Sequence, residues 1–346
     1  MGVACGSQIV LCDMPIHFDT YKGCSHACRY CFVKRNTDIS KIERDNCIKQ
    51  LRRFIDGERT KETNWCDWNI PLHWGGVSDP FQPVERKHGI SYECLRLFAE
   101  TGYPFIVSTK GKLLATEKYL SVLKKCNAVV QLSMVCSKYD VIERGCPSYE
   151  ERLTMAQKIA PNCKRLIVRL QPYMTEVFRD VLENIPRLKE AGVYGVTIEG
   201  MKFVKKKEGL VRVGGDYCYP VDILEKHFIA IKKECHKHGL KFFCAENRLR
   251  VLGDHMTCCG TAGLEGFSGN SYNLSHMYNG GAKATRCMGC EGTASCFSAL
   301  KQKAGYSKFL KGKSFEDMMA AYYNEGLYKD ALKYNGRITC HNVSNN

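Results

Sequence analysis

The feature that most constrains the fold is a regular alternation of short β-rich runs with amphipathic helical runs through the first 250 residues. Parallel strands joined by crossover helices give this pattern. It predicts an α/β fold with a parallel sheet built from six repeats. The strands are expected near residues 14–20, 70–76, 104–109, 128–135, 165–171 and 193–199, with a further strand at 241–245 closing the series.

Two helical segments carry recognisable end signals, and a third contains an internal proline. A helix beginning at Val221 places apolar residues on one stripe and is expected to stop at Gly239. Another should open at Ser148, with Glu151 three residues on completing a capping box. A third, near residues 175–191, contains Pro186, which should kink or split it.

Composition indicates a globular protein with an unusual cysteine content. The chain has 346 residues, 44% of them hydrophobic, but no apolar run approaches the ~20 residues of a membrane span. The N-terminus lacks the basic and apolar blocks of a signal peptide, so we expect a cytoplasmic protein with no membrane partner. The 21 cysteines therefore suggest metal or redox chemistry rather than disulfides. Isolated ones in apolar segments are expected to be buried structural thiols, namely Cys94, Cys126, Cys163 and Cys235.

The net charge of +15 would favour a polyanion such as nucleic acid. The basic residues are spread along the chain, however, and the densest run is only Lys205–Lys207. A solvated loop accounts for that run equally well. Charge alone names no substrate.

One loop groups Cys24, Cys28 and Cys31 within eight residues, directly after the first expected strand. Three thiolates from one loop can ligate three corners of a cubane iron–sulfur cluster and leave the fourth iron open to an exchangeable ligand. The alternative is a structural zinc site. Zinc normally takes four closing ligands in paired Cys-x2-Cys spacing, which this loop does not supply.

The Cys-x3-Cys-x2-Cys spacing, with Tyr30 before the last cysteine, resembles the signature of the radical S-adenosylmethionine (SAM) superfamily. The resemblance implies a partial (β/α)6 barrel with its active site at the carboxyl ends of the strands. It also implies a [4Fe-4S] cluster on Cys24, Cys28 and Cys31 whose open iron binds SAM. Such enzymes cleave SAM reductively to a 5′-deoxyadenosyl radical that abstracts hydrogen from the substrate, and they need an electron donor such as flavodoxin or ferredoxin.

Two further runs, one at residues 78–83 and one at residues 143–148 followed by Arg152, resemble the spore photoproduct lyase branch of that superfamily. Carried over by motif, Lys110 and Ser133 would bind the SAM carboxylate. Arg169 is a weaker candidate, since an ion pair inside the barrel explains it equally well. The full set of implied SAM contacts is Tyr30, Gly75, Gly76, Ser78, Asp79, Lys110, Ser133 and Arg169.

One position departs from that branch. Its hydrogen-donating cysteine lies two residues before the matching serine, and this chain has Gly76 there. Repair of thymine photoproducts is therefore not expected. Cys136 and Cys244 are replacement donors in principle, but buried inert thiols are the simpler interpretation of both.

After about residue 250 the sequence becomes rich in Gly, Ser and Asn, which predicts a small cysteine-rich C-terminal module (251–346) covering the barrel domain (1–250). Its Cys-x2-Cys-x5-Cys run resembles the SPASM or twitch auxiliary-cluster modules. We expect a second [4Fe-4S] cluster there, over the open end of the barrel, with structural zinc as the alternative. Its candidate ligands are Cys258, Cys259, Cys287, Cys290 and Cys296.

The leading functional hypothesis is a lyase that cleaves a bond in a modified nucleobase-like small molecule, for example a 7-deazaguanine such as queuine. It follows from the resemblance to a lyase that acts on a modified base. The second hypothesis is radical modification of a nucleic acid or a peptide. The non-enzymatic alternative is a zinc-stabilised binding protein.

Overall fold

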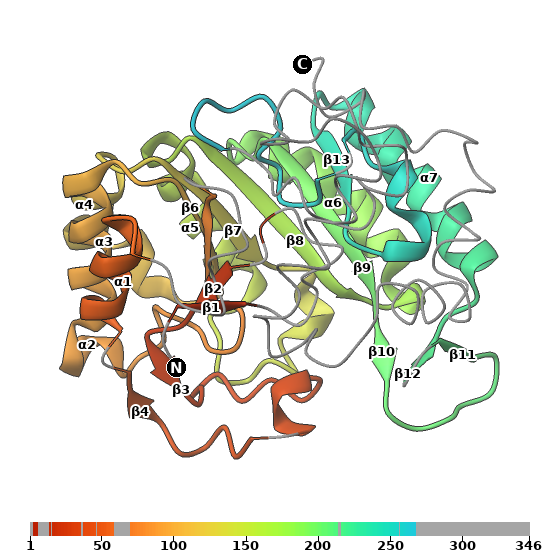
Figure 1. Ribbon diagram of the computed structural model, residues 1–346. Helices are drawn as coiled ribbons and strands as arrows, with labels where there is room; N and C mark the ends of the chain where they lie inside the picture. The colour runs from red at the N-terminus through yellow and green to blue at the C-terminus, as the bar shows by residue number, and fades with distance from the viewer. Residues whose placement is uncertain are drawn as a thin grey trace, which may run out of the picture.

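The computed structural model describes residues 3–5, 14, 16–35, 37–45, 47–58, 70–213, 216–255 and 257–267. Its centre is an eight-stranded sheet in the order β1-β2-β5-β6-β7-β8-β9-β13 (Figure 1). The pairs from β2 to β13 are parallel, and β1 joins the edge antiparallel to β2. The strands are β1 (Ala4–Cys5), β2 (Ile16–Phe18), β5 (Leu72–Trp74), β6 (Phe105–Thr109), β7 (Ala128–Ser133), β8 (Arg165–Tyr173), β9 (Gly195–Gly200) and β13 (Lys241–Cys244).

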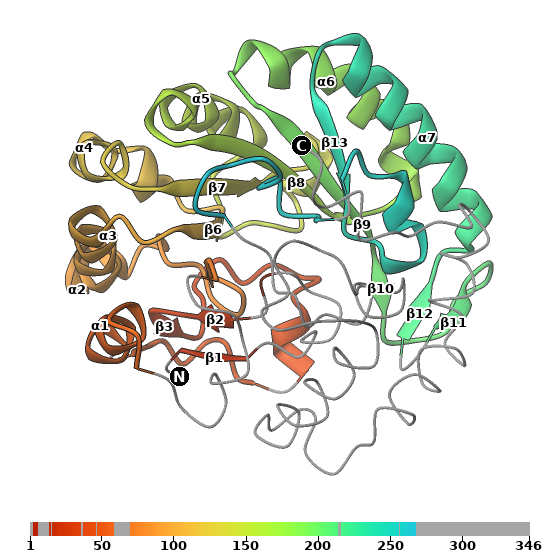
Figure 2. The same cartoon turned by 45° about the horizontal axis from the view of Figure 1, so that its top comes forward.

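All seven predicted strands are present, which confirms the parallel α/β fold. From β2 to β13, each sheet strand pairs with the one that follows it in the chain, so the strand order never reverses. Right-handed crossovers of this kind put every helix on one side, and the sheet curls around its other side. Figure 2 shows this curl, with the helices outside it. Since β1 and β13 do not pair with each other within the described residues, the barrel is partial.

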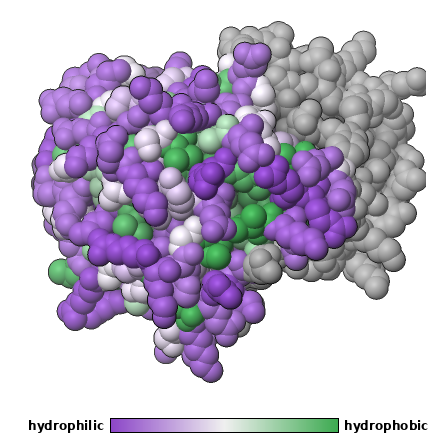
Figure 3. All heavy atoms as spheres, turned by 90° about the vertical axis from the view of Figure 1, so that its left-hand side faces the viewer, coloured by the Kyte–Doolittle hydropathy of each residue, from purple (hydrophilic) through white to green (hydrophobic). Residues whose placement is uncertain are grey.

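The helices cover the convex face of the sheet and separate it from solvent (Figures 1 and 2). The side formed by the first helices is largely hydrophilic, with small apolar areas (Figure 3). No described helix is both long enough and apolar enough to cross a lipid bilayer. The helices are α1 (Ile48–Ile55), α2 (Glu85–His88), α3 (Ile90–Thr101), α4 (Glu117–Leu123), α5 (Tyr149–Ile159), α6 (Phe178–Glu190) and α7 (Val221–Lys237).

The main core lies between the sheet and these helices. Strand residues that face outward, such as Trp74 and Phe105, are fully buried against helix residues such as Phe98. The Phe98 and Phe105 rings stack with centroids 4.1 Å apart. Each buried aromatic side chain of this size stabilises the fold by roughly 1.5–3 kcal/mol.

The inner face of the barrel has two layers of different character. Near the amino ends of the strands it is apolar, with Ile106, Val129, Ile167 and Phe243 in one buried group. Towards the carboxyl ends the inward positions become polar, as at Ser108 and Gln131. Because side chains alternate between the two faces of a strand, these polar groups point into the barrel and not into the helical core.

The predicted helix signals can now be compared with the structure. Helix α7 ends as expected: Gly239 has φ +68°, its N–H bonds the His236 carbonyl, and the Leu240 N–H bonds the Cys235 carbonyl. This is a Schellman motif. The capping box of Ser148 and Glu151 is confirmed. Pro186 does not split α6, which buries Val181, Ile185 and Leu188 along its length.

Two small sheets escaped the sequence analysis. β3 (Tyr21–Lys22) pairs with β4 (Glu43–Arg44) beside the cysteine loop. β10 (Lys202–Phe203), β11 (Val211–Val213) and β12 (Asp216–Cys218) form a three-stranded arm that continues from the carboxyl end of β9 (Figure 1). Arg35 ties this arm to the residues after the cysteine loop through a 2.5 Å ion pair between its Nη1 and Asp216 Oδ1. These strands have two or three residues each, too short for a clear periodic pattern.

Candidate functional site

The cysteine loop lies at the carboxyl end of the barrel, after β2 and β3. Gly23 opens it with φ +73°, and a Cβ there would approach the Lys41 carbonyl oxygen to 2.4 Å. The backbone of Cys24 donates to the Ile39 carbonyl at 2.8 Å. Cys28 is buried, whereas Cys24 and Cys31 are partly exposed. The loop is thus fixed at its start and presents its thiols at the end of the barrel where such folds carry their chemistry.

Side chains of the 78–83 run hold this loop in place through hydrogen bonds and an ion pair. Gln82 Oε1 accepts from the Ser25 backbone N–H at 2.8 Å, and Gln82 Nε2 donates to the Gly23 carbonyl at 3.2 Å. Asp79 Oδ2 lies 3.3 Å from His26 Nε2. Ser78 donates its hydroxyl to the Tyr21 carbonyl at 2.7 Å. The motif therefore positions the loop that carries the thiols.

Asp79 is the main electrostatic anchor of the loop. It is 8% exposed and accepts from Thr109 Oγ1 at 2.7 Å and from the Lys110 backbone N–H at 2.6 Å. Burial alone would raise the pKa of Asp79, but His26 and these hydrogen bonds hold it at about 2. Burial opposes protonation of His26, yet the Asp79 charge raises the pKa of that imidazole above its usual value. A charged pair is the favoured state of this contact.

The 143–148 run clamps the loop from its other side. The Gly145 carbonyl lies 2.8 Å from His26 Nδ1, and a Cβ at Gly145 would come within 2.5 Å of the His26 carbonyl oxygen. Glu143 accepts from the Tyr30 hydroxyl and forms a 2.6 Å ion pair with Arg152, which is fully buried. Both spore photoproduct lyase-like runs thus meet at the cysteine loop.

The thiols of this loop differ in burial and in the groups near them. No three His, Cys, Asp or Glu side chains of the described residues are placed to hold one metal ion. In a cubane each thiolate binds a different iron, so a single-ion grouping is not required. The Cys28 sulfur lies 3.6 Å from that of Cys146, and this contact lowers the pKa of Cys28. Burial and the nearby Asp79 raise the pKa of Cys24 to about 12.

The residues expected to contact SAM lie at the carboxyl ends of neighbouring strands. Gly75 has φ +86°, and a Cβ there would be 2.5 Å from the Ser108 carbonyl oxygen. Lys110 Nζ lies 3.9 Å from Glu143 Oε1 and 5.6 Å from the Tyr30 ring centroid, so it faces the cysteine loop. Ser133 pairs in register with Arg169 on β8. These positions stand together around the strand ends, and their contact with SAM stays a prediction.

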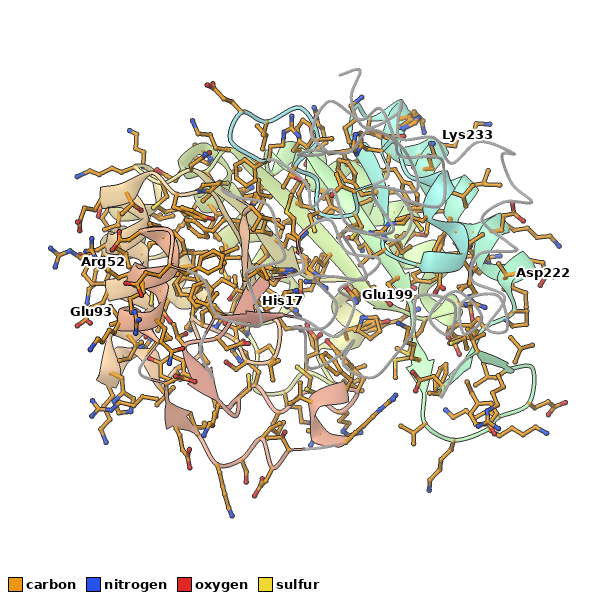
Figure 4. The ribbon with its side chains drawn as sticks, viewed as in Figure 1. His17, Arg52, Glu93, Glu199, Asp222 and Lys233 are labelled. Atoms are coloured by element: carbon orange, nitrogen blue, oxygen red, sulfur yellow. The ribbon has the colours of Figure 1, made fainter. Side chains whose placement is uncertain are left out.

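Arg169 points elsewhere, into the interior of the barrel. Its Nη1 donates to Ser108 Oγ at 2.7 Å and to Gln131 Oε1 at 3.2 Å. Within the described residues no carboxylate lies within ion-pair distance of this guanidinium, so the barrel ion pair considered above is absent. Figure 4 shows His17 and Glu199 near the middle of the molecule, whereas Arg52, Glu93, Asp222 and Lys233 lie at its periphery.

Sequence reasoning missed most of this interior network. His73 Nε2 contacts Ser108 Oγ at 3.0 Å, and the His17 and His73 rings lie 4.8 Å apart. Burial, followed by the charge of Arg169, lowers the pKa of His17 to about 4, so this imidazole is neutral at pH 7. The available signal was the spacing of polar residues two apart within otherwise apolar strands. Gln171 accepts from Arg169 and donates to Glu199, which in turn accepts from Lys202, so these residues continue the network. The missed residues are His17, His73, Ser108, Gln131, Gln171, Glu199 and Lys202.

Comparison with known proteins decides the fold. The complex of spore photoproduct lyase with a dinucleoside spore photoproduct matches with a TM-score of 0.53 at 15% identity, over 67% of this chain and 77% of that one. A double mutant of that enzyme with bound AdoMet and the same dinucleoside gives 0.52 at 16% identity, over 70% and 80%. The chain has the fold of spore photoproduct lyase.

A sequence comparison also finds a distant relative of this chain. An uncharacterized protein of Mycobacterium tuberculosis is 24% identical over 202 residues. That match covers 52% of this chain and spans 57% of the relative's length. The sequence matches no model of a known protein family. At these identities it is the fold that this chain shares with spore photoproduct lyase.

Residues 257–267 lie at the other end of the barrel from the cysteine loop. Cys259 is 4% exposed and packs in the apolar layer at the amino ends of the strands. Arg165, at the start of β8, donates to the Gly260 and Ala262 carbonyls at 2.9 and 2.6 Å. Cys258 accepts from Arg250 Nη2 at 3.5 Å. Residues 257–267 thus cover the amino ends of the strands. They bury apolar inward side chains that would otherwise be exposed to water.

Two of the five candidate ligands of the expected auxiliary cluster, Cys258 and Cys259, lie within the described residues. Cys258 and Cys259 stand at the end of the barrel opposite the predicted first cluster, not over its open end. Cys287, Cys290 and Cys296 lie outside the described residues, as does the rest of the C-terminal module after residue 267. The second cluster stays a prediction.

Asp19, beside the cysteine loop, should make stability depend on pH. Its Oδ1 accepts from the backbone N–H groups of Val77 and Ser78 at 3.0 and 2.9 Å, but burial outweighs these bonds and raises its pKa from 3.8 to about 7. A raised carboxyl pKa stabilises the fold fully below about pH 4, and this contribution is lost as pH rises to about 7.

Asp19→Asn keeps an oxygen that accepts from the Val77 and Ser78 N–H groups, and it removes the titrating carboxyl. Its stability relative to the native chain should therefore rise between pH 4 and pH 7, by at most about 4 kcal/mol. Urea unfolding of both proteins across that range measures the difference. A difference that stays flat with pH would contradict the assignment.

Proposed function

We propose that this chain is a radical SAM enzyme that holds a [4Fe-4S] cluster on Cys24, Cys28 and Cys31. The observation that carries the proposal is the bracing of the cysteine loop at the carboxyl end of a spore photoproduct lyase fold. Gln82 and Asp79 support this loop from one side, and the 143–148 run clamps it from the other. When bound, the cluster and SAM supply reductive cleavage of SAM and hydrogen abstraction from the substrate.

The chain's own residues prepare the site for those groups. Lys110 places a cation beside Glu143 and Tyr30 at the cysteine loop, where a SAM carboxylate could meet it. Gly75 and Gly76 leave backbone without side chains at the end of β5. The helices cover the convex face of the sheet and residues 257–267 cover the amino ends of its strands, which protects a reactive centre from water on those sides.

For the reaction we propose a lyase that cleaves a bond in a modified nucleobase-like small molecule, such as a 7-deazaguanine. Support comes from the fold shared with spore photoproduct lyase and from the polar interior of the barrel. At Gly76, where that branch has its donor cysteine, a Cβ would lie 2.9 Å from His17 Nδ1. A side chain at this position would meet His17 of the neighbouring strand β2, which supports a substrate other than a thymine photoproduct.

A second candidate is modification of a nucleic acid. Lys205, Lys206 and Lys207 are all exposed on the arm at the carboxyl end of β9. With a net charge of +15 they favour a polyanion near the mouth of the barrel. A salt-sensitive gel shift with tRNA or DNA tests this candidate, and migration unchanged at low salt would reject it.

Anaerobic purification and reconstitution with iron and sulfide test the proposed chemistry. We expect about four irons per chain from one cubane, or about eight if the second cluster forms. With SAM and a strong reductant, the loaded protein should release 5′-deoxyadenosine and methionine. A colourless protein that contains zinc and no iron would reject the enzyme in favour of a zinc-stabilised binding protein.

A further inference from the structure

The side chain of Gln171 bridges a cation and an anion inside the barrel. Arg169 and Gln171 are two residues apart on β8, so both face the interior, and Glu199 faces it from β9. Gln171 Oε1 accepts from Arg169 Nε at 3.1 Å and also from Arg169 Nη2. Gln171 Nε2 donates to Glu199 Oε2. All three residues are partly exposed, so a small molecule can reach them.

Neither charge of this bridge is neutralised by the other. Arg169 contacts only neutral acceptors, and no carboxylate of the described residues lies within ion-pair distance of it. Glu199 Oε1 is held by Lys202 Nζ at 2.5 Å, whereas its Oε2 accepts, among the described residues, from the Gln171 amide alone. A cationic donor and a carboxylate acceptor, which is paired with Lys202 through its other oxygen, thus stand on either side of one replaceable amide.

We propose that the lactam edge of a nucleobase displaces the Gln171 carboxamide and binds between Arg169 and Glu199. This inference rests on the proposed function and names the residues that would select its substrate. A carboxamide presents a C=O acceptor beside an N–H donor, and so does the ring lactam of a guanine-type base. The base would form hydrogen bonds to the same two charged residues, Arg169 and Glu199, that the side chain now contacts. Hydrogen bonds to charged partners are stronger than those to neutral ones, and the exchange would lose neither of them.

The geometry also discriminates between base types. Two N–H groups of Arg169 converge on the single Gln171 oxygen, which needs two lone pairs. A carbonyl oxygen has two lone pairs, whereas the ring nitrogen of an adenine-type base has one in the plane of the ring. The site should therefore prefer a lactam over an amidine edge.

Binding of 7-deazaguanine and 7-deazaadenine to the reconstituted full chain without SAM tests the proposal by calorimetry. We expect 7-deazaguanine to bind at least tenfold more tightly. Glu199→Gln and Arg169→Met should each weaken its binding tenfold to a hundredfold, because each removes a charged hydrogen-bond partner. Glu208→Gln and Arg179→Met, which alter exposed charges, are the matched controls and should leave binding unchanged.

Gln171→Ala separates a displaced side chain from a structural one. Removing the competing carboxamide should leave the affinity for 7-deazaguanine unchanged or raise it, and a tenfold loss would overturn the displacement. Equal affinity for the two bases, or native affinity in both Glu199→Gln and Arg169→Met, would overturn the proposal. Thermal unfolding identifies a variant that fails to fold, and the other variant then decides. A chain that releases 5′-deoxyadenosine but binds neither base refutes this inference alone; one that binds 7-deazaguanine but no iron refutes the proposed chemistry alone.

Discussion

Alanine at Cys24 or Cys31 is expected to remove nearly all cluster iron from the anaerobically reconstituted chain. A cubane held by three thiolates on one loop loses a corner with each substitution, and two remaining thiolates do not retain it. Iron and sulfide counts per chain measure the effect. Cys163→Ala is the matched control, because this partly exposed thiol lies two residues before β8, outside the cysteine loop, and donates to the Ala160 carbonyl at 3.8 Å.

Cys28 should behave differently from the other two. Its sulfur lies 3.6 Å from that of Cys146, so the Cys146 thiol could bind the iron that loses its ligand when Cys28 is replaced. Cys28→Ala should therefore keep more iron than Cys24→Ala, and the double variant Cys28→Ala/Cys146→Ala should lose it. Full iron content in Cys24→Ala or Cys31→Ala would contradict the assignment of the loop.

Arg152→Met should destabilise the chain by about 3–5 kcal/mol, the cost of leaving a buried charge without its partner. Arg152 is fully buried, pairs with Glu143 at 2.6 Å and donates to the Ser133 carbonyl at 2.8 Å. Without it the Glu143 carboxylate would keep, among the described residues, the Tyr30 hydroxyl and the more distant Lys110. Urea unfolding measures the loss of stability.

Arg187→Met is the control for that variant. Arg187 forms an ion pair with Glu150 at the same 2.6 Å, but both side chains are exposed to solvent. Surface pairs contribute about 0–1 kcal/mol. Equal effects of the two substitutions would show that burial does not set the strength of the Arg152 pair. Glu143→Gln combined with Arg152→Met should recover part of the loss, because the uncompensated charge is gone.

The strands and the cysteine loop could be predicted because their signals are local. Each β-rich run is short and apolar, and the three thiols lie within eight residues, so no knowledge of distant contacts was needed. The capping box at Ser148 and the glycine after α7 are local in the same sense. Short elements such as β10 to β12 escaped because two or three residues carry no period.

The sequence by itself determined the seven parallel strands, the end of the barrel that carries the thiols, and the iron–sulfur hypothesis, because each follows from spacing along the chain. Only the tertiary structure decided the roles around them. It brings Gln82 to Ser25 across 57 positions and Gly145 to His26 across 119, and it turns Arg169 away from Lys110 towards Gln171. Contacts between distant residues depend on strand register and on how the sheet curls, and neither is written in any local pattern.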